Sequence, residues 1–93
     1  MVAELNRQRG QLLQRQGHTE AAEELYGKAL SIAREQDAKL WELRAAVSLA
    51  RLRRAQGRCA EARDLLAPIY GWFTEGFGTS DLREAKALLD ELG

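Results

Sequence analysis

The sequence contains an internal repeat with a period of forty residues. When residues 3–33 are slid forward by forty, identical residues coincide: Leu12 with Leu52, Gln16 with Gln56, Gly17 with Gly57, Ala22 with Ala62 and Leu25 with Leu65. The apolar stripe within residues 22–33 also coincides in phase with the stripe within residues 62–73, and both follow amphipathic helical spacing. A stripe and a glycine turn that repeat together indicate two copies of one helix-turn-helix unit.

Apolar residues recur at helical spacing along almost the whole chain, and no run alternates with the period of two of a half-buried strand. We therefore predict an all-α fold with helices over residues 2–16, 19–36, 40–56, 59–73 and 80–92. Residues 2–36 and 40–73 form two antiparallel helix-turn-helix units, and the helix over 80–92 caps them. Together they make one domain, residues 1–93, built as a right-handed helical repeat stack.

Small residues mark the turns and crossings of each unit. Gly17 and Gly57 lie just past the first helix of each unit, where a left-handed residue ends a helix without a Cβ clash. Two pairs of small residues are expected to face each other across the helix pairs: Gly10 with Ala22, and Ala50 with Ala62. Small side chains at these positions predict a close crossing.

Composition narrows the possible partners and location. The 93 residues are 45% apolar, enough for one compact domain, and fourteen basic residues balance fourteen acidic ones. A chain without net charge is a poor partner for nucleic acid or an anionic membrane, so neither is predicted. The longest uncharged stretch, residues 65–74, is about half a bilayer crossing, and residues 1–10 do not resemble a signal peptide. With the single cysteine Cys59, these features predict a cytoplasmic protein.

The sequence does not predict a catalytic site. Cys59 and His18 fall at equivalent turns of successive units, and stacked helices lie about 8–10 Å apart. A nucleophile and its base must approach to roughly 3 Å. One histidine and one cysteine also cannot complete a four-ligand metal site, and no glycine-rich phosphate loop occurs. We predict no enzyme activity, no cofactor and no metal.

The units resemble the tetratricopeptide repeat, a 34-residue helical hairpin. The first unit carries the small, aromatic and turn residues of that pattern, and the second carries a weaker version: Gly10, Gly17, Ala22, Tyr26 and Ala29, then Ala50, Gly57, Ala62, Leu66 and Ile69. The forty-residue period departs from 34, which indicates longer helices or longer connections. The resemblance implies a tetratricopeptide-like fold and a protein-protein interaction function, with a peptide or protein partner.

Residues 41–92 are also similar to the C-terminal end of bacterial regulators that join an adenylate cyclase-like or winged-helix domain to an AAA-type ATPase and tetratricopeptide repeats. The stretch A-P-I-Y-G-W-F-T-E-G-F, residues 67–77, is the most distinctive part. This resemblance implies that the chain is part of a larger bacterial signalling or transcriptional regulator. The cyclase and ATPase chemistry would lie in sequence that is absent here.

The tetratricopeptide resemblance implies a binding surface, because the first helix of each unit lines a concave groove in that family. The groove positions transfer here to a basic, amide-rich strip: Glu4, Arg7, Gln11, Gln14 and Arg15 in unit one, and Arg44, Val47, Arg51, Arg54 and Ala55 in unit two. Arginine forks bind carboxylates through two hydrogen bonds, so Arg44, Arg51 and Arg54 are predicted to recognise an acidic peptide or a C-terminal carboxylate. The alternative is that the strip is solvated or pairs with acids of a neighbouring repeat.

The two ends of the chain differ. Leu82, Ala85, Leu88, Leu89 and Leu92 lie on one side of the last helix, as expected of a cap that covers the helix before it. The first helix keeps Leu5, Leu12 and Leu13 available to a preceding unit or to a second copy. A second hypothesis is therefore structural: the chain is an end-cap or dimerisation element of a longer helical array. In that case the edge of the first helix forms a homodimer or contacts upstream repeats.

Four aromatic residues follow Pro68 closely: Tyr70, Trp72, Phe73 and Phe77. Trp72 and Phe73 continue the apolar stripe of the helix over 59–73, so we expect both to be buried in the core or under the cap. For Tyr70 and Phe77 the sequence does not distinguish between packing in the core and binding a partner. Pro68 should bend this helix or interrupt its hydrogen bonding.

Overall fold

The computed structural model describes residues 2–73 and 80–92. It contains five α-helices, which are α1 (Val2–Arg15), α2 (Thr19–Glu35), α3 (Lys39–Ala55), α4 (Cys59–Trp72) and α5 (Ser80–Leu92). Each predicted helix end lies within one residue of the observed one. The all-α fold is confirmed. Phe77 and the Glu4 side chain lie outside the described residues.

Three turns with the same hydrogen bonding connect the first four helices. Gly17 and Gly57 have φ angles of 88° and 79°, as the glycine signals predicted, and Asp37 takes the same left-handed conformation at φ 52°. The backbone N–H groups of His18, Ala38 and Arg58 each donate to the carbonyl five residues back, at 2.8–2.9 Å. This is the Schellman motif, which satisfies the last carbonyls of a helix.

These turns explain the forty-residue period. Helices α2 and α3 are each 17 residues long, and only residues 36–38 and 56–58 separate consecutive helices. Two such helices with two such turns make up forty residues, so the excess over 34 lies in the helices and not in the connections. The sequence left these two explanations open, and the helix lengths decide between them.

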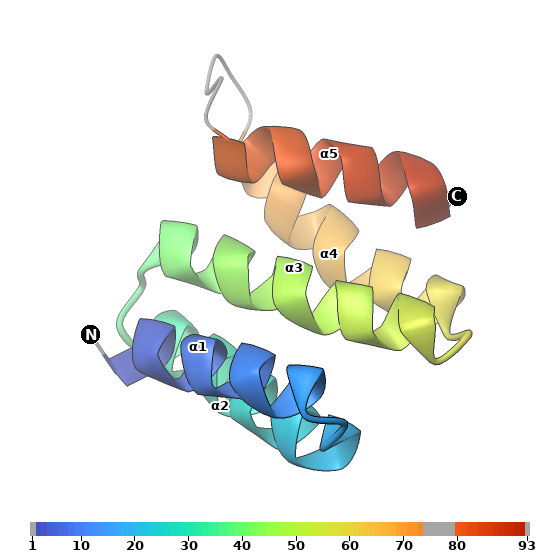
Figure 1. Cartoon of the computed structure of the whole chain (residues 1–93). Helices are drawn as coiled ribbons and strands as arrows, with labels where there is room; N and C mark the ends of the chain where they lie inside the picture. Colours follow the sequence, from blue (N-terminus) through green and yellow to red (C-terminus); the bar gives the residue numbers. More distant parts are fainter. Residues whose placement is uncertain (1, 74–79, 93) are drawn as a thin grey trace.

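The helices form two layers (Figure 1). Helices α1, α3 and α5 lie side by side in one layer and run in the same direction, while α2 and α4 lie behind them. Helix α5 therefore takes the place that the first helix of a third unit would occupy. It contacts α4, as expected of a cap, and it also contacts α3.

Two clusters of buried side chains hold the layers together. The smaller cluster joins α2 to α3 and consists of Ala22, Tyr26, Leu49 and Leu52. The larger one spans α2 to α5 and includes Leu43, Leu66, Leu82 and Leu88. The predicted close crossing of α1 and α2 is confirmed, because a Cβ atom placed on Gly10 would lie 3.3 Å from the carbonyl oxygen of Ala22.

The aromatic residues after Pro68 do not behave alike. The expected burial of Trp72 is wrong, since 57% of this residue is exposed. The Trp72 ring lies beside Lys39 and outside the larger cluster, whereas its neighbours Phe73 and Tyr70 both pack partly buried against that cluster. Helix α4 continues through Pro68 to Trp72, so the proline does not end the helix.

The expectation that Leu13 is available to a preceding unit is also wrong, because Leu13 packs partly buried against the smaller cluster, which contains Tyr26.

Candidate groove along α1, α3 and α5

The side chains predicted to bind a partner line one groove formed by α1, α3 and α5. Three hollows adjoin along it, because Ser48 and Arg51 line the first two and Arg51 and Glu84 line the second and third. All seven predicted residues line these hollows: Arg7, Gln11, Gln14, Arg44, Val47, Arg51 and Arg54. The structure therefore brings the predicted set together on one face, while its binding role stays a prediction.

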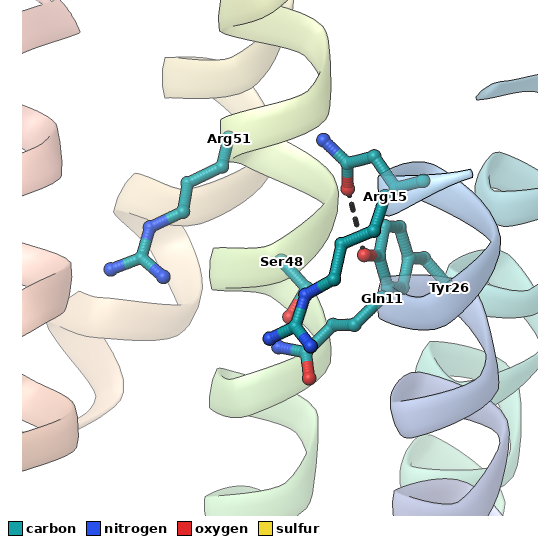
Figure 2. Close-up of a pocket in the computed structure, with 6 residues that line it drawn as sticks. Gln11, Arg15, Tyr26, Ser48 and Arg51 are labelled. Atoms are coloured by element: carbon teal, nitrogen blue, oxygen red, sulfur yellow. Dashed lines mark hydrogen bonds between the residues drawn. The ribbon is translucent and has the colours of Figure 1, made fainter. Parts of the chain in front are cut away.

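The hollow between α1 and α3 has a volume of about 350 Å³ and is lined by polar side chains: Gln11, Gln14, Arg15, Tyr26, Ser48 and Arg51. Figure 2 shows the guanidinium group of Arg15 reaching from α1 toward Ser48 on α3, close to Gln11. Arg51 points the other way, toward α5. No acidic side chain lines this hollow among the described residues.

Tyr26 forms the floor of this hollow although it belongs to α2. Its ring is 1% exposed, and its hydroxyl donates a 2.8 Å hydrogen bond to Oε1 of Gln14. Burial raises the pKa of Tyr26 above its ordinary value of 10.0, and the positive charges of Arg7, Arg15 and Arg51 oppose that shift. Three arginines thus lie near enough to the hydroxyl to act on its pKa, although the effect of burial is larger. Sequence reasoning placed Tyr26 only in the core, because its helical stripe gives no sign that the ring tip reaches the groove.

At the other end of the groove, Arg44 forms a fork-to-fork pair with Asp81 of α5. The Nε and Nη2 atoms of Arg44 donate to the two carboxylate oxygens of Asp81, each at 3.1 Å. The same guanidinium group lies 4.7 Å from the ring centroid of Trp41. An arginine held by two parallel hydrogen bonds and an aromatic face has a defined orientation.

Arg51 and Arg54 also face acids of α5. Nη2 of Arg51 lies 3.4 Å from Oε2 of Glu84, and Arg54 pairs with Glu91. The predicted alternative was that the basic strip pairs with acids of a neighbouring repeat; here the acids belong to the capping helix α5. The spacing in the sequence does not foretell these pairs, because the arginines are seven and three residues apart along α3 and their acids are three and seven residues apart along α5.

These ion pairs are half-exposed, so they contribute little to the free energy of unfolding. Exposed pairs are typically worth about 0.2–1 kcal/mol each. The apolar residues of α5 that are buried against α4 and α3, namely Leu82, Ala85 and Leu88, contribute more, because burying one leucine side chain is worth about 1.5–3 kcal/mol. The ion pairs therefore determine which charges of the groove remain free more than they hold α5 in place.

Neither a group of metal ligands nor a membrane-spanning helix is found in the described part of the chain. Among residues 2–73 and 80–92, no cluster of three histidine, cysteine, aspartate or glutamate side chains is placed to bind a metal ion. No helix in the same residues is long and apolar enough to cross a membrane. Cys59 is a partly buried free thiol, and His18 is exposed.

Stacked helix-turn-helix units whose first helices line a common groove define the class of helical-repeat proteins. A family model described as tetratricopeptide repeat matches residues 1–67, and the chain belongs to this family. Tetratricopeptide repeats generally mediate protein-protein interaction. No curated protein and no solved structure matches the chain.

Proposed function

We propose that the chain binds a protein or peptide partner through the α1/α3/α5 groove, with an acidic group of the partner seated in the hollow between α1 and α3. The observation that carries this proposal is the lining of the hollow, which holds Arg15 and two glutamines and no described acid. No ion pair of Arg15 is found within the described residues, in contrast to the paired arginines of α3. Its guanidinium group is thus free to bind a carboxylate through two hydrogen bonds.

The side chains around Arg15 support the same ligand chemistry. Because Oε1 of Gln14 accepts the hydrogen bond of Tyr26, the amide nitrogen of Gln14 keeps its two protons for a ligand oxygen. Gln11 supplies a second amide. Oγ of Ser48 accepts a 3.4 Å hydrogen bond from Nη1 of Arg7, and the Ser48 hydroxyl keeps its own proton to donate. A carboxylate here would therefore meet donors from both α1 and α3.

The arginines predicted for acidic recognition have a conditional role in this proposal. Arg44, Arg51 and Arg54 bind a partner's carboxylate only when it replaces an acid of α5. Arg51 is the best placed, because it also lines the α1/α3 hollow and 47% of its side chain is exposed. A partner that runs from Arg15 along the groove would reach Arg51 before the two others.

The test uses random peptides with free C-termini, displayed and selected on the 93-residue chain, and measures the Kd of the selected peptides by fluorescence anisotropy. We expect acidic peptides, and Arg15→Glu should weaken their binding at least about tenfold, equivalent to about 1.4 kcal/mol. The matched control is Arg9→Glu, which makes the same charge change at an exposed position of α1 that does not line the hollow. Unchanged binding by Arg15→Glu would contradict the proposal.

The wider setting follows from the resemblance of residues 41–92 to bacterial regulators. We place the chain in a larger cytoplasmic signalling or transcriptional regulator, where the groove would hold another domain or a partner protein. The net charge of zero argues against nucleic acid as that partner.

A second candidate function, as an element of a longer helical array, is favoured by the outer edge of α1. Leu5 and Leu12 are 49% and 55% exposed there. Forty residues later, Ala45 and Leu52 occupy the equivalent positions and are only 1% and 2% exposed, because unit one covers them. A helical hairpin resembling unit one would cover Leu5 and Leu12 in the same way, and so could a second copy of the chain.

This candidate predicts that the isolated chain self-associates through α1. Sedimentation equilibrium over a wide concentration range should show dimers that the double variant Leu5→Gln and Leu12→Gln no longer forms, because both substitutions remove exposed apolar surface. Leu40→Gln serves as the control, since Leu40 is an exposed leucine on α3. A chain that is monomeric at every concentration would contradict association through this edge.

A further inference from the structure

A separate hollow, outside the α1/α3/α5 groove, lies where the end of α2, the start of α3 and the end of α4 meet. It has a volume of about 200 Å³ and shares no lining residue with the α1/α3/α5 groove. Apolar and charged side chains line it together: Arg34, Lys39, Glu42, Pro68, Ile69 and Trp72. We call these six residues the outer pocket.

Trp72 gives the outer pocket an exposed but ordered aromatic wall. The residue is 57% exposed, yet its ring lies edge-on to Phe73 at a centroid distance of 5.1 Å, and Phe73 packs against the core. Nζ of Lys39 lies 5.3 Å from the indole centroid, within the range of a cation-π contact. Tryptophan is among the residue types that are enriched in interface hot spots.

The charges of the outer pocket do not cancel. Glu42 is 6% exposed and is shared by two cations, with Arg34 Nε at 3.3 Å and Lys39 Nζ at 3.4 Å. One buried carboxylate thus faces two positive groups, and 54% of the Arg34 side chain remains open to solvent. This leaves one positive charge in excess beside an apolar wall, which is complementary to a carboxylate next to an apolar side chain.

The repeat itself shows that this surface is peculiar to unit two. Pro68 and Trp72 stand where unit one has Lys28 and Ile32. Lys28 is exposed and Ile32 is partly buried, so the equivalent surface of unit one carries a charge and hides its apolar residue. Unit two replaces the charge with proline and exposes an indole, although neither change is needed for the core.

We infer that the outer pocket is a second docking site, which binds a protein segment carrying an apolar side chain beside an acidic one. The apolar side chain would pack on Trp72, Pro68 and Ile69, and the carboxylate would lie between Arg34 and Lys39. A protein segment fits better than an anionic membrane, because two cations and one indole on a chain of zero net charge give little attraction for a charged surface. The inference stands apart from the proposed groove function, with which it shares no residue.

Random linear peptides are selected for binding to the full chain carrying Arg15→Glu, a substitution that disables the groove. Peptides that also bind the double variant Arg15→Glu and Trp72→Ala are then removed. We expect peptides with an acidic residue next to an apolar one. On the wild-type chain, Trp72→Ala and Arg34→Glu should each raise their Kd at least about tenfold. The control variants Trp41→Phe and Arg63→Glu, the latter an exposed arginine on α4, should leave the Kd unchanged.

The Trp41→Phe chain also supplies a direct signal, because Trp72 is then the only tryptophan. Its emission should shift to shorter wavelength when a selected peptide covers the indole. The inference is overturned if no peptide survives the Trp72→Ala step, if the survivors lack acids, or if Arg34→Glu binds them as well as wild type. A comparable shift with vesicles of equimolar phosphatidylcholine and phosphatidylglycerol would overturn it in favour of a membrane surface. Failure of the groove proposal would change none of these readings, since the selection is made without Arg15.

Discussion

Replacing Tyr26 with alanine is expected to lower the free energy of unfolding by about 3–5 kcal/mol, the cost of truncating a fully buried aromatic side chain. The ring is 1% exposed and connects three helices: it touches Gly10 of α1 from its place on α2 and clusters with Leu49 and Leu52 of α3. Its loss would leave a cavity where the two units meet. For a small domain whose whole stability is about 5–15 kcal/mol, such a change populates the unfolded state substantially.

Urea unfolding followed by circular dichroism measures this loss. Tyr26→Phe is the matched control, because it keeps the ring and removes only the hydroxyl that donates to Gln14, for an expected cost of about 1 kcal/mol. If Tyr26→Ala costs no more than Tyr26→Phe, the ring is not the packing centre between the units.

Gly10→Val is expected to destabilise the chain by about 2–3 kcal/mol through overpacking. A Cβ atom on Gly10 would lie 2.6 Å from Cε1 and 2.8 Å from Cδ1 of Tyr26, and 3.3 Å from the carbonyl oxygen of Ala22. Both neighbours are held in the core, since Ala22 is 0% and Tyr26 is 1% exposed. The helices α1 and α2 must therefore separate to accept the side chain.

Gly27→Ala provides the opposite result on the neighbouring helix. A Cβ atom there meets nothing within 4 Å, so the variant should gain the helix propensity of alanine, up to about 1 kcal/mol. Thermal and urea unfolding of both variants give the comparison. Equal effects at the two glycines would show that helix propensity, and not the close crossing, governs Gly10.

The helices and turns could be predicted closely because their signals are local and are repeated. A left-handed residue after the helix and an apolar stripe within it are read from neighbouring positions, and Gly17 and Gly57 carried that signal plainly. Asp37 was missed as the third left-handed turn residue, since aspartate takes this conformation only when the hydrogen bonds around it favour it.

The members of the candidate groove were also predictable, but not the state of their charges. Helical spacing is enough to place Arg7, Gln11 and Gln14 on one face of α1, and the repeat carries the same face to α3. Which arginines remain free depends on α5, whose direction and register beside α3 bring Asp81 and Glu84 to Arg44 and Arg51. Neither direction nor register follows from the amphipathic pattern of α5 alone.

The helices of the described residues and their ends were readable from the amino-acid sequence, because they depend on backbone conformation and on side-chain spacing within a single helix. The packing of the helices against one another set two further features: α5 neutralises the basic strip of α3, and Trp72 lies exposed beside Lys39. The physical reason is that both outcomes depend on where residues some thirty to forty positions apart come to rest against each other. That placement is set by how all five helices pack together, and no single helix contains it.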